Sequence, residues 1–441
     1  MTSASLSRRL ALLATFAALL GLVSCGSGGG SGGQTNVRAI NLTTDLASLD
    51  IYLGGTKQFS ALASGAVSNS LSLDANTYTV NVNSAGNASN LFTGSYSLTK
   101  DAHYTAVVWG PQASLRVTAL PEDDDTSVIT SGNAKIRVLN ATTETGALDV
   151  YLTAPGADLS AASPIQGNLP SGSLAGYKDI AATGTTYQLR VTSQGNPKDV
   201  RLDIGSVSLT AAKYQTLVLT AGTGGTLING QLIVNQGAAT SLVNSQARVR
   251  FAASVDSGGA VTVAVGGTAL SPGGLVATAQ GFYTSVTAGN AALTTTVNGV
   301  KLLTTPQAIT LASGTDYTLL VYGSPANPQV VTIVDDNRLP SISGRTKIRV
   351  VNGVAGLGAL SMSVDNVAPL ETSFVVAGTG SAYAQLASNS SSNISVGTAT
   401  LPAIYASTRP PGDLLTSQSV YTVFVLSGGA KPQGFLLKDT P

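Results

Sequence analysis

An internal repeat with a period of about 100 residues is the feature that most limits how this chain can fold. Each copy opens with an aliphatic residue followed by arginine. The four openings are "VRAINLTTDLASLDIYLGG", "IRVLNATTETGALDVYLTA", "VRFAASVDSGGAVTVAVGG" and "IRVVNGVAGLGALSMSVDN". Their arginines lie 99, 113 and 99 residues apart and are Arg38, Arg137, Arg250 and Arg349. This period is too long for a solenoid repeat and is typical of small domains in tandem.

A second signature closes each copy with a tyrosine at the start of an apolar run. The closing runs are "LTKDAHYTAVVWGP", "LTAAKYQTLVLTAG", "LASGTDYTLLVYGSP" and "LTSQSVYTVFVLSGG", with Tyr104, Tyr214, Tyr317 and Tyr421. A leucine lies six residues before the tyrosine in three copies and five residues before it in the second. This pattern resembles the tyrosine corner of Greek-key sandwiches, whose phenol bonds back to the upstream backbone. Because a role in fixing the fold must recur in every copy, we assign these tyrosines a structural role.

Short alternating runs favour strands over helices throughout the repeats. Residues 49–53 are apolar at odd positions, which gives one buried face. Turn residues follow such runs roughly every 8 to 12 residues, as in all-β sandwiches. Hydrophobic residues make up 43% of the chain and charged residues only 10%. We predict an all-β fold with four tandem immunoglobulin-like antiparallel β-sandwich domains, at residues 36–125, 134–236, 247–337 and 346–441.

The repeats resemble a family known as domain of unknown function 4397. The resemblance rests on the aliphatic–Arg opening, the Leu-Asp-hydrophobic-Tyr strand and the late Tyr-Thr-x-x-Val strand, and it covers about residues 36–439. It implies tandem domains of secreted or surface-attached bacterial proteins, and no established activity. The family's aspartate is matched by Asp50 and Asp149, but the later copies have Thr262 and Ser361. The repeated arginine persists without that aspartate, so we expect another partner for it, such as a turn carbonyl.

The N-terminus is typical of a bacterial lipoprotein signal peptide. Arg8 and Arg9 precede an apolar segment at residues 10–23, which is too short to span a membrane. The segment ends in "LVSC", which resembles a lipobox, and Cys25 is the single cysteine of the chain. We therefore predict a signal peptide at residues 1–24, lipid attachment at Cys25 and a Gly/Ser linker at residues 25–35. An ordinary secretory signal that happens to contain a cysteine is the alternative.

A lipidated Cys25 implies a membrane partner and an address in the bacterial cell envelope. Several acyl chains, as mature bacterial lipoproteins carry, suffice for stable anchoring. The residue after the cysteine is Gly26 rather than Asp, which favours export to the outer membrane if the host is Gram-negative. The sequence does not decide between the periplasmic face and the surface-exposed face. The formal net charge of +1 and the absence of a basic run exclude an electrostatic footprint for nucleic acid.

Residues that could carry chemistry are few. His103, the single histidine, lies in a polar turn and is interpreted as inert, and no metal ligand set of His and Cys can be built. The acidic runs "PEDDD" and "VDDN" lie at domain junctions and are interpreted as solvated linkers, with a calcium site as the alternative. "TAGTGGTLING" is interpreted as a hairpin turn rather than a phosphate loop. Trp109 is interpreted as a packing residue rather than a sugar platform.

Two functional classes remain, and neither needs a catalytic residue or a cofactor. The first is a non-enzymatic, lipid-anchored surface array for structural or adhesive interaction. The second is a binding module for a glycan or a secreted protein, through loops at the ends of the domains. An envelope hydrolase is the weakest alternative. A polar pocket in one copy would favour ligand binding, and four plain copies would favour the array.

Overall fold

The computed structural model describes residues 33–222, 224–302, 307–369, 374–407, 412–427 and 429–439. The signal peptide, Cys25 and most of the predicted linker lie outside these ranges. Within them the chain is all-β, and its helices are three short 3-10 turns, η1 (Gln112–Ser114), η2 (Leu159–Ala161) and η3 (Asp256–Gly258). None of the helices in the described part has the length and apolarity that a membrane span requires.

The strands fall into four consecutive groups, which we call units 1 to 4. Unit 1 has two four-stranded sheets, with the orders β4-β1-β7-β8 and β3-β2-β5-β6. Unit 2 repeats this plan with the orders β12-β9-β15-β16-β17 and β11-β10-β13-β14. The strands are β1 (Gln34–Thr43), β2 (Ser48–Leu53), β3 (Thr56–Ala63), β4 (Leu71–Asp74), β5 (Thr77–Ser84), β6 (Asn90–Ser97), β7 (His103–Gly110), β8 (Arg116–Pro121), β9 (Asn133–Ala141), β10 (Leu148–Thr153), β11 (Gln166–Leu169), β12 (Lys178–Ala181), β13 (Tyr187–Ser193), β14 (Asn196–Val207), β15 (Tyr214–Ala221), β16 (Ile228–Val234) and β17 (Ala239–Leu242).

Unit 3 keeps the plan with more and shorter strands. Its sheets have the orders β22-β18-β27-β28, with β23 also on β18, and β20-β19-β24-β25, with β21 on β19 and β26 on β24. The strands are β18 (Gln246–Val255), β19 (Ala260–Val265), β20 (Thr268–Ala269), β21 (Leu275–Val276), β22 (Ala279–Gln280), β23 (Thr284–Thr287), β24 (Gly289–Val297), β25 (Val300–Lys301), β26 (Ala308–Leu311), β27 (Asp316–Ser324) and β28 (Asn327–Asp335).

Unit 4 has one complete sheet, β31-β29-β37-β38 with β32 on β29, and a divided one, β30-β34-β35 and β33-β36. Its edge strand β35 has only two residues, where unit 1 has the eight-residue β6. The strands are β29 (Arg345–Asn352), β30 (Ser361–Val364), β31 (Thr379–Gly380), β32 (Ala384–Ala387), β33 (Asn389–Ser392), β34 (Ile394–Gly397), β35 (Tyr405–Ala406), β36 (Asp413–Leu415), β37 (Val420–Leu426) and β38 (Gln433–Lys438).

The strand order corrects the expected immunoglobulin-like, wholly antiparallel topology. In an immunoglobulin constant domain the first strand shares a sheet with the second, fourth and fifth strands. Here the first strand of each unit pairs in parallel with the strand that carries the closing signature: β1 with β7, β9 with β15, β18 with β27 and β29 with β37. The remaining ladders are antiparallel. A strand that is covered on both faces is buried at successive residues rather than at every second one. β29 and β37 are buried in this way over most of their length.

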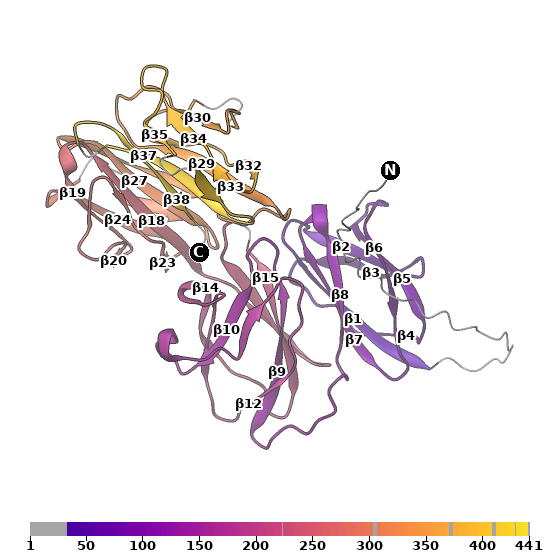
Figure 1. Cartoon of the computed structure of the whole chain (residues 1–441). Helices are drawn as coiled ribbons and strands as arrows, with labels where there is room; N and C mark the ends of the chain where they lie inside the picture. Colours follow the sequence, from indigo (N-terminus) through magenta and orange to yellow (C-terminus); the bar gives the residue numbers. More distant parts are fainter. Residues whose placement is uncertain are drawn as a thin grey trace, which may run out of the picture.

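Six hydrophobic clusters show what covers those strands. Four clusters lie inside the individual units. A fifth joins β1, β7 and β8 of unit 1 to β9, β15 and β16 of unit 2, with Ile40 and Trp109 packed near Leu139 and Val218. A sixth joins β18 and β27 of unit 3 to β29 and β37 of unit 4. The units therefore pack in two pairs, the indigo and magenta pair and the salmon and yellow pair of Figure 1.

Candidate functional site

The repeated arginines lie on the sheet faces at which the units pair. Each sits on the first strand, opposite a threonine of the parallel partner strand, and its Nε donates to that threonine's Oγ1 over 2.9 to 3.1 Å. The four arginines are between 1 and 8% exposed. The pairs are Arg38 with Thr105, Arg137 with Thr216, Arg250 with Thr318 and Arg349 with Thr422.

In the first pair of units each arginine also donates to backbone carbonyls of the neighbouring unit. Arg38 of unit 1 donates to the carbonyls of Val234, at 2.9 Å, and Gly237, both in unit 2. Arg137 of unit 2 donates to the carbonyl of Pro121, at 2.6 Å, at the end of β8 in unit 1. Strand-end and turn carbonyls are thus partners of both arginines, beside the carboxylates of Glu122 and Asp124, and neither arginine bonds to Asp50 or Asp149.

In the second pair of units, each arginine bonds to an aspartate of the neighbouring unit. Arg250 of unit 3 bonds to Asp439 of unit 4 at 2.5 Å, and Arg349 of unit 4 bonds to Asp335 of unit 3. The side chains of Asp335 and Asp439 are fully buried. Burial alone would raise the pKa of Asp335, but the two guanidinium groups, Arg349 first, hold it below its usual value. Removing one partner of a buried ion pair strongly destabilises the folded protein, because the other charge stays buried without compensation.

Three of the four arginines also lie against a tyrosine ring, a feature that the sequence analysis did not identify. The distances from guanidinium carbon to ring centroid are 4.5 Å for Arg137 over Tyr177, 4.5 Å for Arg250 over Tyr283 and 4.6 Å for Arg349 over Tyr383. Contacts of this length are favourable cation–π interactions. The sequence does contain a signal for these contacts, since a tyrosine lies 33 to 40 residues after the arginine in units 2 to 4.

Units 2 and 3 are also joined by buried charges. Asp199 on β14 of unit 2 bonds to Arg248 on β18 of unit 3, and Arg248 bonds in turn to Asp316, at 2.5 and 2.7 Å. Burial raises the pKa of Asp199, but the charges of Arg201 and Arg248 lower it to about 2. The backbone N–H of Leu339, between units 3 and 4, donates to the carbonyl of Glu144 in unit 2 at 2.7 Å.

The acidic runs are solvated only in part, which corrects the expectation of solvated linkers. Glu122 has a side chain only 4% exposed and bonds to Arg38 at 2.7 Å. Asp124 bonds to Arg137 at 2.6 Å, and Asp336 bonds to Lys347 at 2.9 Å. The carboxylates of these runs neutralise cations on the packed faces. Among the described residues, no group of three or more His, Cys, Asp or Glu is placed to hold a metal ion.

Asp50 and Asp149 hold turns in place. Asp50 accepts from the Lys57 ammonium at 2.7 Å and from the backbone N–H groups of Ala61 and Gly86. Its hydrogen bond to Lys57, aided by these N–H groups, lowers the pKa of the carboxyl to about 2. Asp149 accepts two backbone N–H bonds in the same way. Both carboxylates are buried.

The corner position is filled by tyrosine in three units only. The hydroxyl groups of Tyr104, Tyr317 and Tyr421 accept the backbone N–H five residues upstream, at 3.3, 2.9 and 3.0 Å. In unit 2 the residue at the same register is Gln215, whose side chain both accepts from and donates to the backbone of Thr210. The assignment of Tyr214 to the corner is therefore wrong, and its hydroxyl instead donates to the carbonyl of Ser127.

The other singled-out residues have local roles. His103 lies at the start of β7, where its Nδ1 is 2.9 Å from a carboxylate oxygen of Asp123. Trp109 is 2% exposed in the cluster between units 1 and 2, and its indole N–H donates to Thr118. The glycine-rich run connects β15 to β16 in an antiparallel hairpin.

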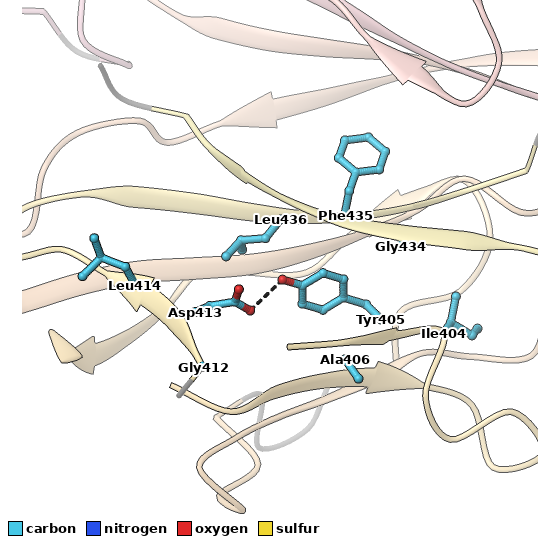
Figure 2. Close-up of a pocket in the computed structure, with 9 residues that line it drawn as sticks. All are labelled: Ile404, Tyr405, Ala406, Gly412, Asp413, Leu414, Gly434, Phe435 and Leu436. Carbon is cyan, nitrogen blue, oxygen red and sulfur yellow. Dashed lines mark hydrogen bonds between the residues drawn. The ribbon is translucent and has the colours of Figure 1, made fainter. Parts of the chain in front are cut away.

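Unit 4 has a groove at the seam between its sheets, and we call it the seam groove (Figure 2). Its volume is about 560 Å³. It lies between the two sheets, where the short edge strand β35 faces the edge strand β38. It is lined by Ile404, Tyr405, Ala406, Gly412, Asp413, Leu414, Gly434, Phe435 and Leu436.

Three polar side chains meet at the wall of the seam groove. The Tyr405 hydroxyl donates to Oδ2 of Asp413 at 2.6 Å, as Figure 2 shows, and the Ser407 hydroxyl donates to the same oxygen at 2.7 Å. Leu414 is 57% exposed at the rim. Gly434 lies so close to β35 that a Cβ there would come within 2.5 Å of the Cβ of Tyr405.

The corresponding seam is closed in unit 1. There the edge strand β6 has eight residues, and the hydroxyl of Tyr96 on β6 donates to the carbonyl of Val117 on β8 at 2.8 Å. In unit 4 the sequence after β35 reads Ser-Thr-Arg-Pro-Pro, and proline cannot donate to a ladder. Residues 408–411 themselves lie outside the described ranges.

Comparisons with known proteins identify a family. The model described as "Domain of unknown function (DUF4397)" matches residues 35–151 and 247–363. No curated protein matches. A structure from Bacteroides uniformis to which cell adhesion is ascribed is 14% identical, with a TM-score of 0.21, and the match covers 47% of this chain and 99% of that one. The family 26 carbohydrate-binding module from Eubacterium rectale Amy13K, in complex with maltoheptaose, is 16% identical, with a TM-score of 0.16, over 46% of this chain and 97% of that one. These TM-scores are too low to inform the fold or the function of this chain.

Proposed function

The chain belongs to the DUF4397 family, and we propose that it is a non-enzymatic, lipid-anchored protein of the bacterial cell envelope. It serves as a tandem array of four β-sandwich domains for structural or adhesive interaction. In this proposal Cys25 carries the lipid, and the outer membrane is the anchoring surface.

The buried charged contacts at all three junctions carry this proposal. Arg38 and Arg137 join units 1 and 2, Arg248 joins units 2 and 3, and Arg349 joins units 3 and 4. Flexible strings of domains have solvated linkers and small polar interfaces. Apolar clusters combined with buried ion pairs instead favour a fixed arrangement, which suits a protein that holds its distal units at a set distance from an anchor.

Small-angle X-ray scattering of the chain without residues 1–25 tests the fixed arrangement. We expect a single rigid shape whose radius of gyration is the same at low and high salt, because buried pairs are screened little. Arg248→Leu should broaden the distance distribution, whereas Arg345→Leu, on a residue that is exposed in unit 4, should leave it unchanged. Scattering typical of a flexible chain of domains in the unsubstituted protein would contradict the proposal.

Lipid anchoring and the location in the cell envelope are tested in cells. Cys25→Ala should release the protein from the membrane fraction, because the acyl chains are then not attached. Retention of the variant in the membrane would refute lipid anchoring at this residue. Protease treatment of intact cells then separates the two faces: digestion supports a surface array, and resistance would exclude adhesion to external partners.

Ligand binding is the second candidate function. The seam groove favours it, because four units without a pocket would have favoured the array alone. The groove occurs in unit 4, which is the described unit furthest in sequence from Cys25. It lies at the side seam of the unit rather than among the end loops that the sequence favours as a binding site.

A further inference from the structure

We propose that the seam groove of unit 4 binds a neutral carbohydrate, with Asp413 and Tyr405 as the recognising side chains. This inference goes beyond the array proposed above, and it does not depend on lipid anchoring or on the rigidity of the junctions.

The size of the groove fits a short stretch of a glycan. Its volume of about 560 Å³ lies within the range of about 300 to 1,000 Å³ that is usual for small-molecule sites. At the seam of unit 1, side chains fill the space between the edge strands. A seam of that kind would not offer this room.

The polar groups suit hydroxyl-rich ligands. The carboxylate of Asp413 can accept hydrogen bonds from two neighbouring hydroxyl groups, because a carboxylate offers about four lone-pair sites and two are taken by Tyr405 and Ser407. The negative charge of Asp413 disfavours phosphates, uronic acids and acidic peptides. The edges of β35 and β38 that face away from their ladders add backbone donors and acceptors.

The apolar groups suit the carbon face of a sugar ring. Tyr405 presents a ring beside the carboxylate, and aromatic side chains with one polar end are well suited to partly wet binding sites. The exposed Leu414 extends this apolar wall to the rim. Figure 2 shows Phe435 directed away from Tyr405 and Asp413, and Phe435 stacks on Phe424 with ring centroids 5.6 Å apart. Phe435 therefore belongs to the packing between units rather than to the binding surface.

An extended peptide fits the groove less well than a glycan. A peptide that adds to a sheet needs a long straight edge. Here β35 has two residues, and it already touches β38 where Gly434 packs against Tyr405. A strand cannot be inserted between edges that are in contact, whereas a compact sugar can occupy the hollow beside that contact.

Isothermal titration calorimetry on the whole chain without residues 1–25 tests the inference. The probes are cellohexaose, chitohexaose and maltohexaose, with hexagalacturonate as the anionic probe and the peptide Thr-Val-Thr-Val-Thr-Val as the strand probe. We expect at least one neutral oligosaccharide to bind with a Kd of about 1 mM or tighter, as shallow sites do. Hexagalacturonate and the peptide should not bind.

Variants then place the binding at the seam groove. Asp413→Asn and Tyr405→Ala should each weaken binding about tenfold or more, the effect of losing one or two good hydrogen bonds or a stacking face. Tyr405→Phe keeps the ring and should weaken binding less than Tyr405→Ala. The control, Asp158→Asn, removes an exposed carboxylate that caps the η2 turn in unit 2, and it should leave the affinity unchanged. Thermal unfolding confirms that each variant is folded.

Three results would overturn the inference. They are an absence of binding for all three neutral probes, binding that is unaffected by both Asp413→Asn and Tyr405→Ala in folded protein, and binding of the peptide in preference to the sugars. None of these results affects the proposed array, which is tested by scattering and by cell fractionation.

Discussion

Replacing Arg349 by leucine is the most direct test of the contacts between units 3 and 4. The guanidinium is 1% exposed, and it bonds to Asp335, Thr422 and the carbonyl of Val334. Without it, Asp335 remains buried with the hydroxyl groups of Tyr283 and Thr318, each 2.5 Å away, and with Arg250 at 3.7 Å. The variant thus leaves a buried carboxylate that is only partly compensated.

The expected loss of stability is large. Removing one partner of a buried ion pair typically costs about 3 to 5 kcal/mol. Units 3 and 4 together comprise nearly two hundred residues, for which each kcal/mol lowers the melting temperature by about 2 to 4 °C. Differential scanning calorimetry should therefore show the transition of these units lowered by about 6 to 20 °C.

Two further variants control this experiment. Arg338→Leu removes a partner of Asp336 in the same linker, but both side chains are at least 40% exposed, so the loss should not exceed about 1 kcal/mol. Arg349→Leu with Asp335→Asn removes the uncompensated charge as well, and it should be more stable than Arg349→Leu alone. If Arg349→Leu proves no more harmful than Arg338→Leu, the reasoning about the buried interface is refuted.

Two other predictions follow from the corner and turn residues. Gln215→Ala should destabilise unit 2 by about 1 to 3 kcal/mol, because the backbone of Thr210 loses both partners, whereas Tyr214→Phe should cost less; urea unfolding of both variants compares them, and a larger effect for Tyr214→Phe would contradict the corner assignment. The pKa of Asp50 is lowered from 3.8 to about 2, so its contribution to stability is present above the unfolded pKa and is lost as the pH falls towards the folded pKa. The stabilities of Asp50→Asn and the unsubstituted protein should therefore converge at low pH, and a constant gap across the acid range would show that Asp50 does not titrate in this way.

The sequence was informative wherever the signal lay within one repeat. The period and the arginine positions could be read from the recurring opening motif, and the strand content could be read from local alternation and turn residues. The Leu-to-Tyr gap of five residues in the second copy also contained the signal for Gln215, since Leu209 to Gln215 restores the gap of six. The corner was misassigned because residue type was given more weight than register.

The partners of the arginines could not be predicted in the same way. Arg38 bonds to Val234, which is 196 residues away, and nothing local encodes such a contact. The parallel ladder had a weak signal: β7 and β37 are largely apolar runs, which indicates burial on both faces. The seam groove lies beside β35, which has two residues in the described part of the chain, and the sequence pattern did not predict it.

The reciprocity of the contacts between paired units has a consequence for how such chains can evolve in length. In units 3 and 4, Arg250 reaches Asp439 while Arg349 reaches Asp335, as in the interface of a two-fold symmetric dimer. Deleting or duplicating one unit would leave such a face uncovered and its arginine without a counterpart. Gene duplication should therefore add or remove whole pairs, and the interval of 212 residues both from Arg38 to Arg250 and from Arg137 to Arg349 is the length of one such step.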